Sequence, residues 1–254
     1  MTVTLAAGIH HENSGRAMVL LHSLALDRSV WDALIDHLPA DLTIIAPDLR
    51  GHGASPADDS FTIEDMADDV AATIAELGYP RASVVGMSMG GCVAQAMAVR
   101  HPERVTGLGL IDTTAWYGPD APKAWQERAE KARANGMRSL SQFQLDRWFG
   151  EQFLRAHPEV GQRLLEVFSR NDLDSYVASC RAMGAFDLRE AIGDIAVPTV
   201  IIVGEDDPAT PPAHAEVIHE RIPGSSLHVL PHAKHLTAVE QPAEVAALLA
   251  PLLT

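Results

Sequence analysis

The sequence predicts an α/β fold, in which a mostly parallel sheet is flanked by helices and carries an inserted helical cap. Short apolar runs of strand length alternate with amphipathic stretches of helix length, which is typical of such a sheet. The alternation stops after residue 114 and resumes near Pro198, with only helical signals in between. At residues 84–91 one strand-to-helix junction reads Val-Val-Gly-Met-Ser-Met-Gly-Gly, which contains the pattern Gly-x-Ser-x-Gly.

Composition and charge restrict the class of protein. The 254 residues fit one α/β domain with an elaboration, and 47% hydrophobic residues suit a large core. A formal net charge of -15 argues against binding to nucleic acid or to an anionic membrane surface. Two cysteines give no disulfide framework, and no stretch has membrane-spanning length. We therefore expect a cytoplasmic protein without membrane contact, and we leave a homo-oligomer open.

The first part of the core, residues 1–114, begins with a weakly patterned stretch. Residues 2–12 predict a short edge hairpin through Ala7 and Gly8, and Asn13-Ser14-Gly15 predicts a turn. Continuous apolar runs then predict strands at residues 17–21, 42–46, 82–85 and 105–111. Helices are predicted between these strands, and the buried face of the first one carries Trp31, Leu34, Ile35 and Leu38.

The helix after Thr62 has the clearest start signal. Thr62 and Asp65 have the spacing of a capping box, in which each side chain satisfies a backbone N–H of the first turn. Apolar residues follow at three- and four-residue spacing, so one face of this helix is predicted to be buried. Gly78 and Pro80 end it.

Residues 115–192 are predicted to form the cap. Two of the helical stretches in this segment open with a proline, Pro122 and Pro158. Most of the aromatic residues concentrate here, which predicts a compact, partly apolar pocket. The second part of the core, residues 193–254, then supplies strands at residues 200–203 and 226–230 and helices at residues 211–221 and 239–253.

Ser88 is the predicted nucleophile. The tight turn between strand and helix demands small residues on both sides, which Gly86 and Gly90 supply. Such a turn presents the serine Oγ at the start of a helix, beside the backbone N–H of Met89. A serine hydroxyl also needs a base within hydrogen-bond reach and a carboxylate that orients this base.

The acid and the base are expected in the loops after the last two strands, because ligands bind at the carboxyl ends of parallel strands. His235 is the predicted base, and His232 is its rival in the same loop. Asp207, the last acid of its loop, is preferred over Glu205 and Asp206 because these two are still leaving the strand. The chain order is then Ser, Asp, His.

Three further assignments complete the predicted site. Asp48 also ends a strand, and we expect it to organise its own loop with Arg50 and His52, with a role as orienting acid as the second choice. The backbone N–H groups of Leu24 and Met89 are the predicted oxyanion donors. No metal and no cofactor are expected, because the histidines near the C-terminus share their spacing with no carboxylate and no His-Glu-x-x-His pair is present.

These residues resemble the α/β-hydrolase superfamily over the full length of the chain, and more narrowly the 3-oxoadipate enol-lactonases. The narrower resemblance rests on His22-Ser23-Leu24 with Asp27 and Trp31, Gly86 to Gly91, Arg133 with Gly136-Met137, Arg147-Trp148-Phe149, Tyr176, Cys180, Phe186 to Arg189, Gly204 to Pro212, and His235-Leu236 with Glu240-Gln241-Pro242. It implies a triad of Ser88, Asp207 and His235 and an oxyanion hole of Leu24 and Met89. It also implies an enol-lactone substrate that carries a carboxylate, in the breakdown of aromatic compounds. Many members have Asn-Ser-Leu where this chain has His-Ser-Leu.

The predicted function is therefore cofactor-free hydrolysis of a small ester or lactone through an acyl-enzyme. The substrate carboxylate is expected to meet Arg147 or Arg133 in the cap, and Trp148 is expected to line the pocket. Three alternatives share the triad: a general carboxylesterase, a perhydrolase-like enzyme and a C–C bond hydrolase. A ligand receptor with slow turnover on the same fold is the alternative from another class.

Overall fold

The computed structural model describes residues 1–12 and 15–253, so the turn predicted at Asn13 and Ser14 lies outside the described residues. Within these ranges the strands form one seven-stranded sheet in the order β1-β3-β2-β4-β5-β6-β7. The strands are β1 Ala7–His10, β2 Ala17–Leu21, β3 Thr43–Pro47, β4 Ala82–Met87, β5 Val105–Ile111, β6 Thr199–Gly204 and β7 Ser226–Leu230. All neighbouring strands are parallel except β1 and β3, as the alternation of strands and helices predicts.

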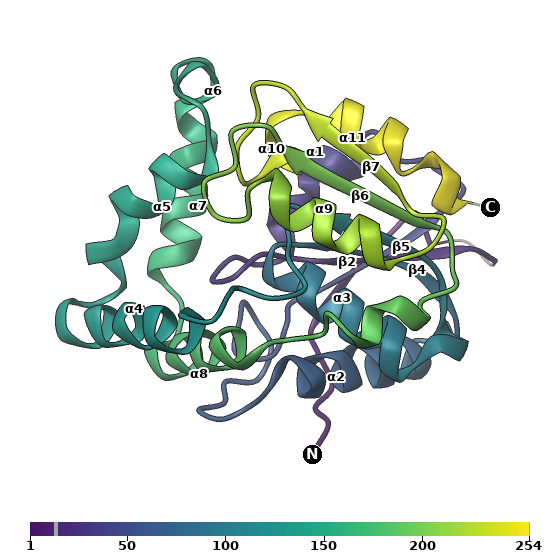
Figure 1. The fold of residues 1–254 in the computed structure, drawn as a ribbon, viewed down its shortest axis with the longest axis horizontal. Coiled ribbons are helices and arrows are strands. Elements are labelled where there is room, and N and C mark those ends of the chain that lie inside the picture. The colour runs from purple at the N-terminus through teal and green to yellow at the C-terminus, as the bar shows by residue number, and fades with distance from the viewer. Residues whose placement is uncertain (13–14, 254) are drawn as a thin grey trace.

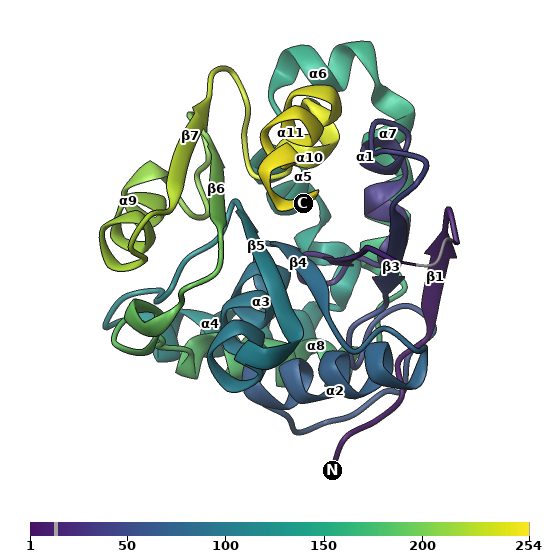
Figure 2. The ribbon, with the colours of Figure 1, turned by 90° about the vertical axis from the view of Figure 1, so that its right-hand side faces the viewer.

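Helices cover both faces of this sheet. The described helices of the chain, including those of the cap, are α1 Asp32–Ile35, α2 Ile63–Glu76, α3 Met89–Arg100, α4 Ala121–Asn135, α5 Ser141–Trp148, α6 Glu151–Ala156, α7 Pro158–Ser169, α8 Leu173–Ala185, α9 Pro212–Arg221, α10 Thr237–Glu240 and α11 Pro242–Leu248. Figure 1 and Figure 2 show α1, α10 and α11 on one face and α2, α3 and α9 on the other. Strands β2, β3, β4 and β6 are buried along their whole length, which explains their continuous apolar runs.

The predicted N-terminal hairpin is wrong. Ala7 and Gly8 lie inside strand β1, which pairs antiparallel with β3 so that Gly8 stands opposite Ala46. Strand β3 would otherwise end the sheet with unpaired backbone groups, and the short N-terminal strand covers that edge. A long-range pairing therefore replaces the local turn.

Most helix starts follow their local signals. The capping box of Thr62 and Asp65 at the start of α2 is confirmed. Pro122 and Pro158 lie in the first turns of α4 and α7, as expected of a residue without a backbone N–H.

Two predicted helices are broken. The first divides into a 3-10 turn, Arg28–Trp31, and the short α1. The closing helix, expected over residues 239–253, divides into α10, α11 and a 3-10 turn, Ala250–Leu253. Pro242 explains the division between α10 and α11, because proline cannot donate the backbone hydrogen bond that a continuous helix needs.

Helices α4 to α8, which we call the cap, lie between β5 and β6 in the sequence and stand together beside the sheet (Figure 1). An isolated antiparallel bridge joins Trp116 to Asp187 and brings together the chain segments that enter and leave the cap. The cap and the carboxyl ends of the strands enclose the cavity described below. Among the described residues, none of the helices combines the length and the apolar character required to cross a bilayer.

Candidate active site

Ser88 stands between β4 and α3 in a strained backbone conformation. Its φ of 55° and ψ of -116° lie where side chains are rarely found. Strand β5 and its following loop hold this conformation, because the Ser88 N–H donates to the Ile111 carbonyl at 2.9 Å and the Ser88 carbonyl accepts from Thr113 Oγ1 at 2.7 Å. The strain is therefore maintained by the sheet and not by the elbow alone.

Gly86 and Gly90 are required at this elbow by the close approach of backbone atoms. A Cβ atom on Gly86 would lie 2.0 Å from the Gly90 carbonyl oxygen. A Cβ atom on Gly90 would lie 2.1 Å from the Leu21 carbonyl oxygen. Backbone atoms of a buried strand and a helix start cannot move aside, so both positions need glycine.

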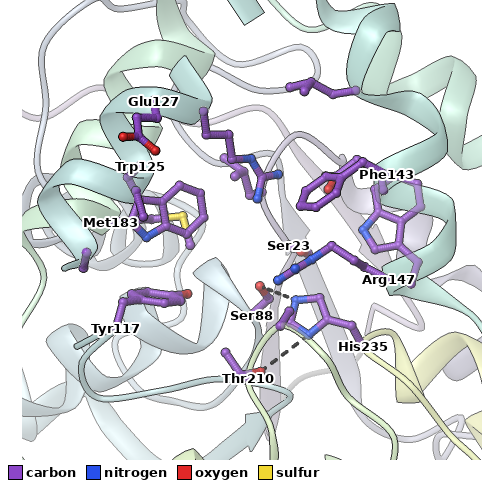
Figure 3. A pocket seen from close by; sticks show the side chains of 18 of the residues that line it. Ser23, Ser88, Tyr117, Trp125, Glu127, Phe143, Arg147, Met183, Thr210 and His235 are labelled. Carbon is purple, nitrogen blue, oxygen red and sulfur yellow. Dashed lines mark hydrogen bonds between the residues drawn. The ribbon is translucent and has the colours of Figure 1, made fainter. Parts of the chain in front are cut away.

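His235 joins Ser88 to Asp207 through its two ring nitrogens, and Figure 3 shows the contact between His235 and Ser88. Its Nε2 lies 2.9 Å from Ser88 Oγ, and its Nδ1 lies 2.8 Å from Asp207 Oδ2. All three residues are at most 6% exposed. The carboxylate favours the tautomer with the proton on Nδ1, so that Nε2 is free to accept the hydroxyl proton of Ser88.

Asp207 is held in its ionised form. Its carboxylate accepts hydrogen bonds from Ala209 N at 2.7 Å, from Thr210 N at 3.1 Å and from Thr210 Oγ1 at 2.9 Å. Burial by itself raises the pKa of Asp207, but His235 and these backbone donors outweigh burial, so the pKa lies below its usual range. The rival acids Glu205 and Asp206 are exposed, as is the rival base His232.

Asp48 organises its own loop, as expected, but the predicted partners are wrong. Its Oδ1 accepts from Arg28 N at 2.9 Å, and its Oδ2 accepts from Ala54 N at 2.8 Å. Arg50 pairs instead with Asp69 at 2.7 Å, because α2 presents that buried acid next to the loop. Asp48, at the carboxyl end of β3, therefore stabilises the loops around it.

Leu24 and Met89 have backbone N–H groups suited to bind an oxyanion. Met89 is the first residue of α3, and the first N–H groups of a helix have no acceptor within it. The Ser23 carbonyl accepts from His22 Nδ1 at 2.8 Å and from Leu26 N at 3.2 Å, and the Leu24 N–H of the same trans peptide points the opposite way. No hydrogen bond among the described residues occupies the N–H of Leu24 or Met89.

A cavity of about 470 Å³ lies between the strand ends and the cap. Core loops contribute Ser23, Ser88, Thr210 and His235 to its lining (Figure 3). Helices α4, α5 and α8, the chain before α4 and the 3-10 turn before α5 contribute mainly apolar side chains, which are Tyr117, Ala121, Ala124, Trp125, Leu140, Phe143, Trp148 and Met183. The cavity is partly apolar, as the concentration of aromatic residues in the cap predicts.

Two arginines also line this cavity, Arg128 of α4 and Arg147 of α5. The Nε of Arg128 donates to Tyr176 Oη at 2.7 Å, and its Cζ lies 4.9 Å from the centroid of the Trp125 ring. Burial and the charge of Arg128 lower the pKa of Arg147. Neither guanidinium forms an ion pair with any described acidic side chain. The lining also includes Asp120, Glu127 and Lys131, so its cationic side chains outnumber its acidic ones in a protein that is acidic as a whole.

The assignment of Arg133 to the pocket is wrong. Its side chain is 49% exposed and pairs with Asp174 at 3.3 Å. Arg128, which was not predicted from the sequence, lines the cavity instead of Arg133. Five residues along a helix correspond to a rotation of about 140°, so Arg128 and Arg133 leave α4 on different faces. The available signal was the three-residue spacing from Trp125 to Arg128, which places both on one face.

A metal ion has no evident place at this site. Both ring nitrogens of His235 are engaged by Ser88 and Asp207. In the described ranges there is no group of three or more His, Cys, Asp or Glu side chains placed to hold a metal ion.

Comparison with known proteins shows which sequences and folds this chain resembles. The family model described as alpha/beta hydrolase fold matches residues 16–242. The 3-oxoadipate enol-lactonase 2 of Acinetobacter baylyi is 33% identical over 227 residues, which are 89% of this chain and 84% of that protein. The structure of an enol-lactonase from Burkholderia xenovorans has a TM-score of 0.93 at 33% identity, over 98% of this chain and 96% of that one. A thermophilic esterase from Thermogutta terrifontis, with malate bound, has a TM-score of 0.91 at 32% identity, over 98% of this chain and 94% of that one.

Proposed function

Because this chain belongs to the α/β-hydrolase fold family, we propose that it is a serine hydrolase of small lactones or esters, with an enol-lactone that bears a carboxylate as its preferred substrate. The hydrogen bonds of 2.8 Å and 2.9 Å that connect Asp207, His235 and Ser88 carry this proposal. They lie at a cavity of about 470 Å³, which suits a small substrate.

In the first half of the reaction Ser88 Oγ attacks the carbonyl carbon while His235 Nε2 takes its proton. The bond between that carbon and the ring or alcohol oxygen then breaks, and His235 returns the proton to the leaving oxygen. Asp207 stabilises the imidazolium that exists between these two transfers. The product is an ester between Ser88 Oγ and the acyl group.

In the second half a water molecule reaches the acyl carbon, after the alcohol of an ester has left or while the opened chain of a lactone stays attached to the acyl group. His235 removes a proton from this water, the resulting nucleophile attacks the acyl carbon, and Ser88 leaves with the proton from His235. A free carboxylic acid is released. The N–H groups of Leu24 and Met89 stabilise the oxyanion in both halves, and each such donor contributes about 3 kcal/mol.

The substrate carboxylate is assigned to Arg128 and Arg147. Both line the cavity together with Ser88, and neither has a described acidic partner to neutralise it. Hydrogen bonds between guanidinium and carboxylate are among the strong ones, and burial strengthens them further. The lactone named for the Acinetobacter baylyi relative and the malate bound to the Thermogutta terrifontis esterase both support an anionic substrate for this chain.

Steady-state hydrolysis of a small panel tests the proposal. The panel contains an enol-lactone with a carboxylate, a saturated γ-lactone, and p-nitrophenyl acetate and butyrate. We expect Ser88→Ala to lose every activity, and the enol-lactone to be preferred by orders of magnitude in the unmodified protein. Ser169→Ala is the matched control, because the Ser169 hydroxyl donates to the Leu165 carbonyl at the end of α7, outside the cavity lining. Activity that survived in Ser88→Ala would refute the proposal.

A general carboxylesterase is the second candidate, and the similarity to the Thermogutta terrifontis esterase supports it. In that case the enzyme would hydrolyse the aryl esters and would not prefer the enol-lactone over them. A burst of product that stopped after a single turnover would instead indicate a slow-turnover receptor.

A further inference from the structure

Asp112 is a buried carboxylate beside the candidate site, and the reaction described above does not use it. It follows β5, is 0% exposed and adopts a left-handed backbone with a φ of 47°. Its N–H donates to the Ile202 carbonyl at 2.9 Å, which anchors it against β6. A buried acid in a strained backbone is costly, so its position needs a physical explanation.

The Asp112 carboxylate joins the two loops that carry the acid and the base. Its Oδ1 accepts from Gly204 N at 3.1 Å, and its Oδ2 accepts from Thr237 N and Thr237 Oγ1, both at 2.8 Å. Gly204 is the last residue of β6 and lies three residues before Asp207. Thr237 is the first residue of α10 and lies two residues after His235. One side chain therefore connects both loops below the triad.

These contacts suit the ionised form, because the carboxylate faces three donors. Among the described residues no lysine or arginine forms an ion pair with it. Burial and the charge of Asp207 raise the pKa of Asp112 to about 7, whereas a charged His235 acts in the opposite direction. The imidazolium of His235 is thus the cation that Asp112 and Asp207 share.

Other titratable groups interact electrostatically with Asp207. They are Arg147 from the cap, His214 from α9 and Tyr117 from the chain before α4. Tyr117 and Arg147 line the cavity, and His214 belongs to α9. The hydrogen bonds of Asp112, in contrast, go to Gly204 and Thr237 in the two loops.

We propose that Asp112 is a positioning residue of this site: its carboxylate holds the loops of Asp207 and His235 together and adds a second negative charge that stabilises the His235 imidazolium during the reaction. This inference rests on the proposed serine-hydrolase function.

The proposal has a consequence for the dependence of the rate on pH. The free enzyme needs neutral His235 as its base, and kcat/KM falls on the acid side as this ring takes up a proton. A negative charge at Asp112 favours the imidazolium, so it moves this acid limb to higher pH while it raises the maximal rate. Protonation of Asp112 itself near pH 7 weakens its hydrogen bonds to both loops. It therefore also lowers the rate on the acid side and moves the acid limb to higher pH.

The test is the profile of kcat and kcat/KM against pH for p-nitrophenyl acetate in Asp112→Asn and Thr237→Val. We expect Asp112→Asn to move the acid limb to lower pH by roughly one unit and to lower the maximal kcat roughly tenfold. Thr237→Val removes one hydrogen bond to Asp112 but keeps the charge and the backbone N–H, so its acid limb stays in place. A lower rate without a shift of the limb in Asp112→Asn, or the same shift in both variants, would overturn the proposal.

A second measurement covers the case in which Asp112→Asn does not fold. In Asp207→Asn, labelled with ¹⁵N-histidine, the His235 ring loses its hydrogen-bonded carboxylate but keeps its electrostatic interaction with Asp112. We expect the His235 ring to be protonated at a higher pH than the buried ring of His22, which serves as the internal reference. Burial lowers the pKa of His22 to about 4. If the His235 ring were protonated only at the same pH as the His22 ring, the inference would be overturned. Failure of the proposed function can be distinguished from failure of this inference, because it would appear as ester hydrolysis that survives in Ser88→Ala.

Discussion

Arg128 and Arg147 come from different helices of the cap and line the same cavity as Ser88, where burial and the charge of Arg128 lower the pKa of Arg147. Two guanidinium groups placed in this way repel one another. The repulsion is maintained because Tyr176 and the Trp125 ring hold Arg128 in position. A bound anion would relieve it, so the substrate carboxylate is the expected occupant of this part of the cavity.

Neutralising either arginine should weaken binding of carboxylate-bearing substrates selectively. We expect Arg147→Gln and Arg128→Gln to raise KM for the carboxylate-bearing enol-lactone roughly tenfold or more, because each loses a charge-assisted hydrogen bond. KM for p-nitrophenyl acetate, which has no carboxylate, should change little. Arg133→Gln is the matched control, since Arg133 belongs to the same helix but is exposed and pairs with Asp174. Equal losses on both substrates would argue against an anion site.

The choice of Asp207 over its neighbours can be tested by removing one charge at a time. Asp207→Asn should lower kcat by roughly 10⁴-fold, because an amide at this position favours the wrong tautomer of His235. Asp206→Asn should change kcat little, since the Asp206 side chain is exposed and Asp207 already occupies Nδ1 of His235. Steady-state kinetics on p-nitrophenyl acetate measures both, and a large loss in Asp206→Asn would contradict the assignment.

His22 should control the oxyanion donor of Leu24. Its Nδ1 donates to the Ser23 carbonyl and its Nε2 accepts from Leu49 N at 2.9 Å, so the ring fixes the peptide that carries the Leu24 N–H. We expect His22→Leu to lower kcat roughly 100-fold with little change in KM, since a misplaced donor acts on the transition state. His22→Asn should retain more of kcat, because its amide can still donate to the Ser23 carbonyl. Equal losses in the two variants would show that this hydrogen bond is not what matters.

The two buried histidines of the oxyanion region should make the fold sensitive to acid. Burial lowers the pKa of His22 to about 4 and that of His52 to about 3, both below the unfolded value of 6.5. A lowered folded pKa means that the unfolded chain binds more protons, so this stability is present above pH 6.5 and is lost as the pH falls toward 4.

Thermal unfolding across this range measures the effect. We expect Tm to fall between pH 6.5 and pH 4, and His52→Gln to reduce the slope because one buried imidazole no longer has to be charged. His219→Gln, which changes an exposed histidine, should leave the slope as it is. A slope that responded equally to both substitutions would assign the acid sensitivity to the general charge of the surface.

Local patterns were sufficient for much of the fold. The runs at residues 17–21 and 105–111 coincide with β2 and β5, because a strand that is buried on both faces is apolar along nearly its whole length. The run at residues 226–230 coincides with β7, which is only partly buried. The capping box at Thr62 and the prolines at the starts of α4 and α7 act within one helical turn. The N-terminal strand could not be foreseen in the same way, because its partner β3 lies more than thirty residues away.

The site residues also differ in whether local sequence patterns could predict them. The Gly-x-Ser-x-Gly pattern indicated Ser88, and the chain order of acid and base indicated Asp207 and His235, which the structure brings to Ser88. Arg128 and Asp112 were missed. Arg128 depends on which face of α4 meets the cavity, and Asp112 depends on two loops that approach each other only in the folded chain.

The sequence by itself determined the α/β fold class and the elbow at Ser88, because both depend on residue types at fixed spacings along the chain. Its resemblance to known sequences indicated the family of hydrolases. Only the tertiary structure decided that Arg128 and not Arg133 lines the cavity, that Asp48 holds a loop with Arg28 and Ala54, and that Asp112 joins the loops of the triad. The physical reason is that charges and hydrogen bonds act over a few ångströms in space, and the groups that meet there are separated by up to 125 residues along the chain.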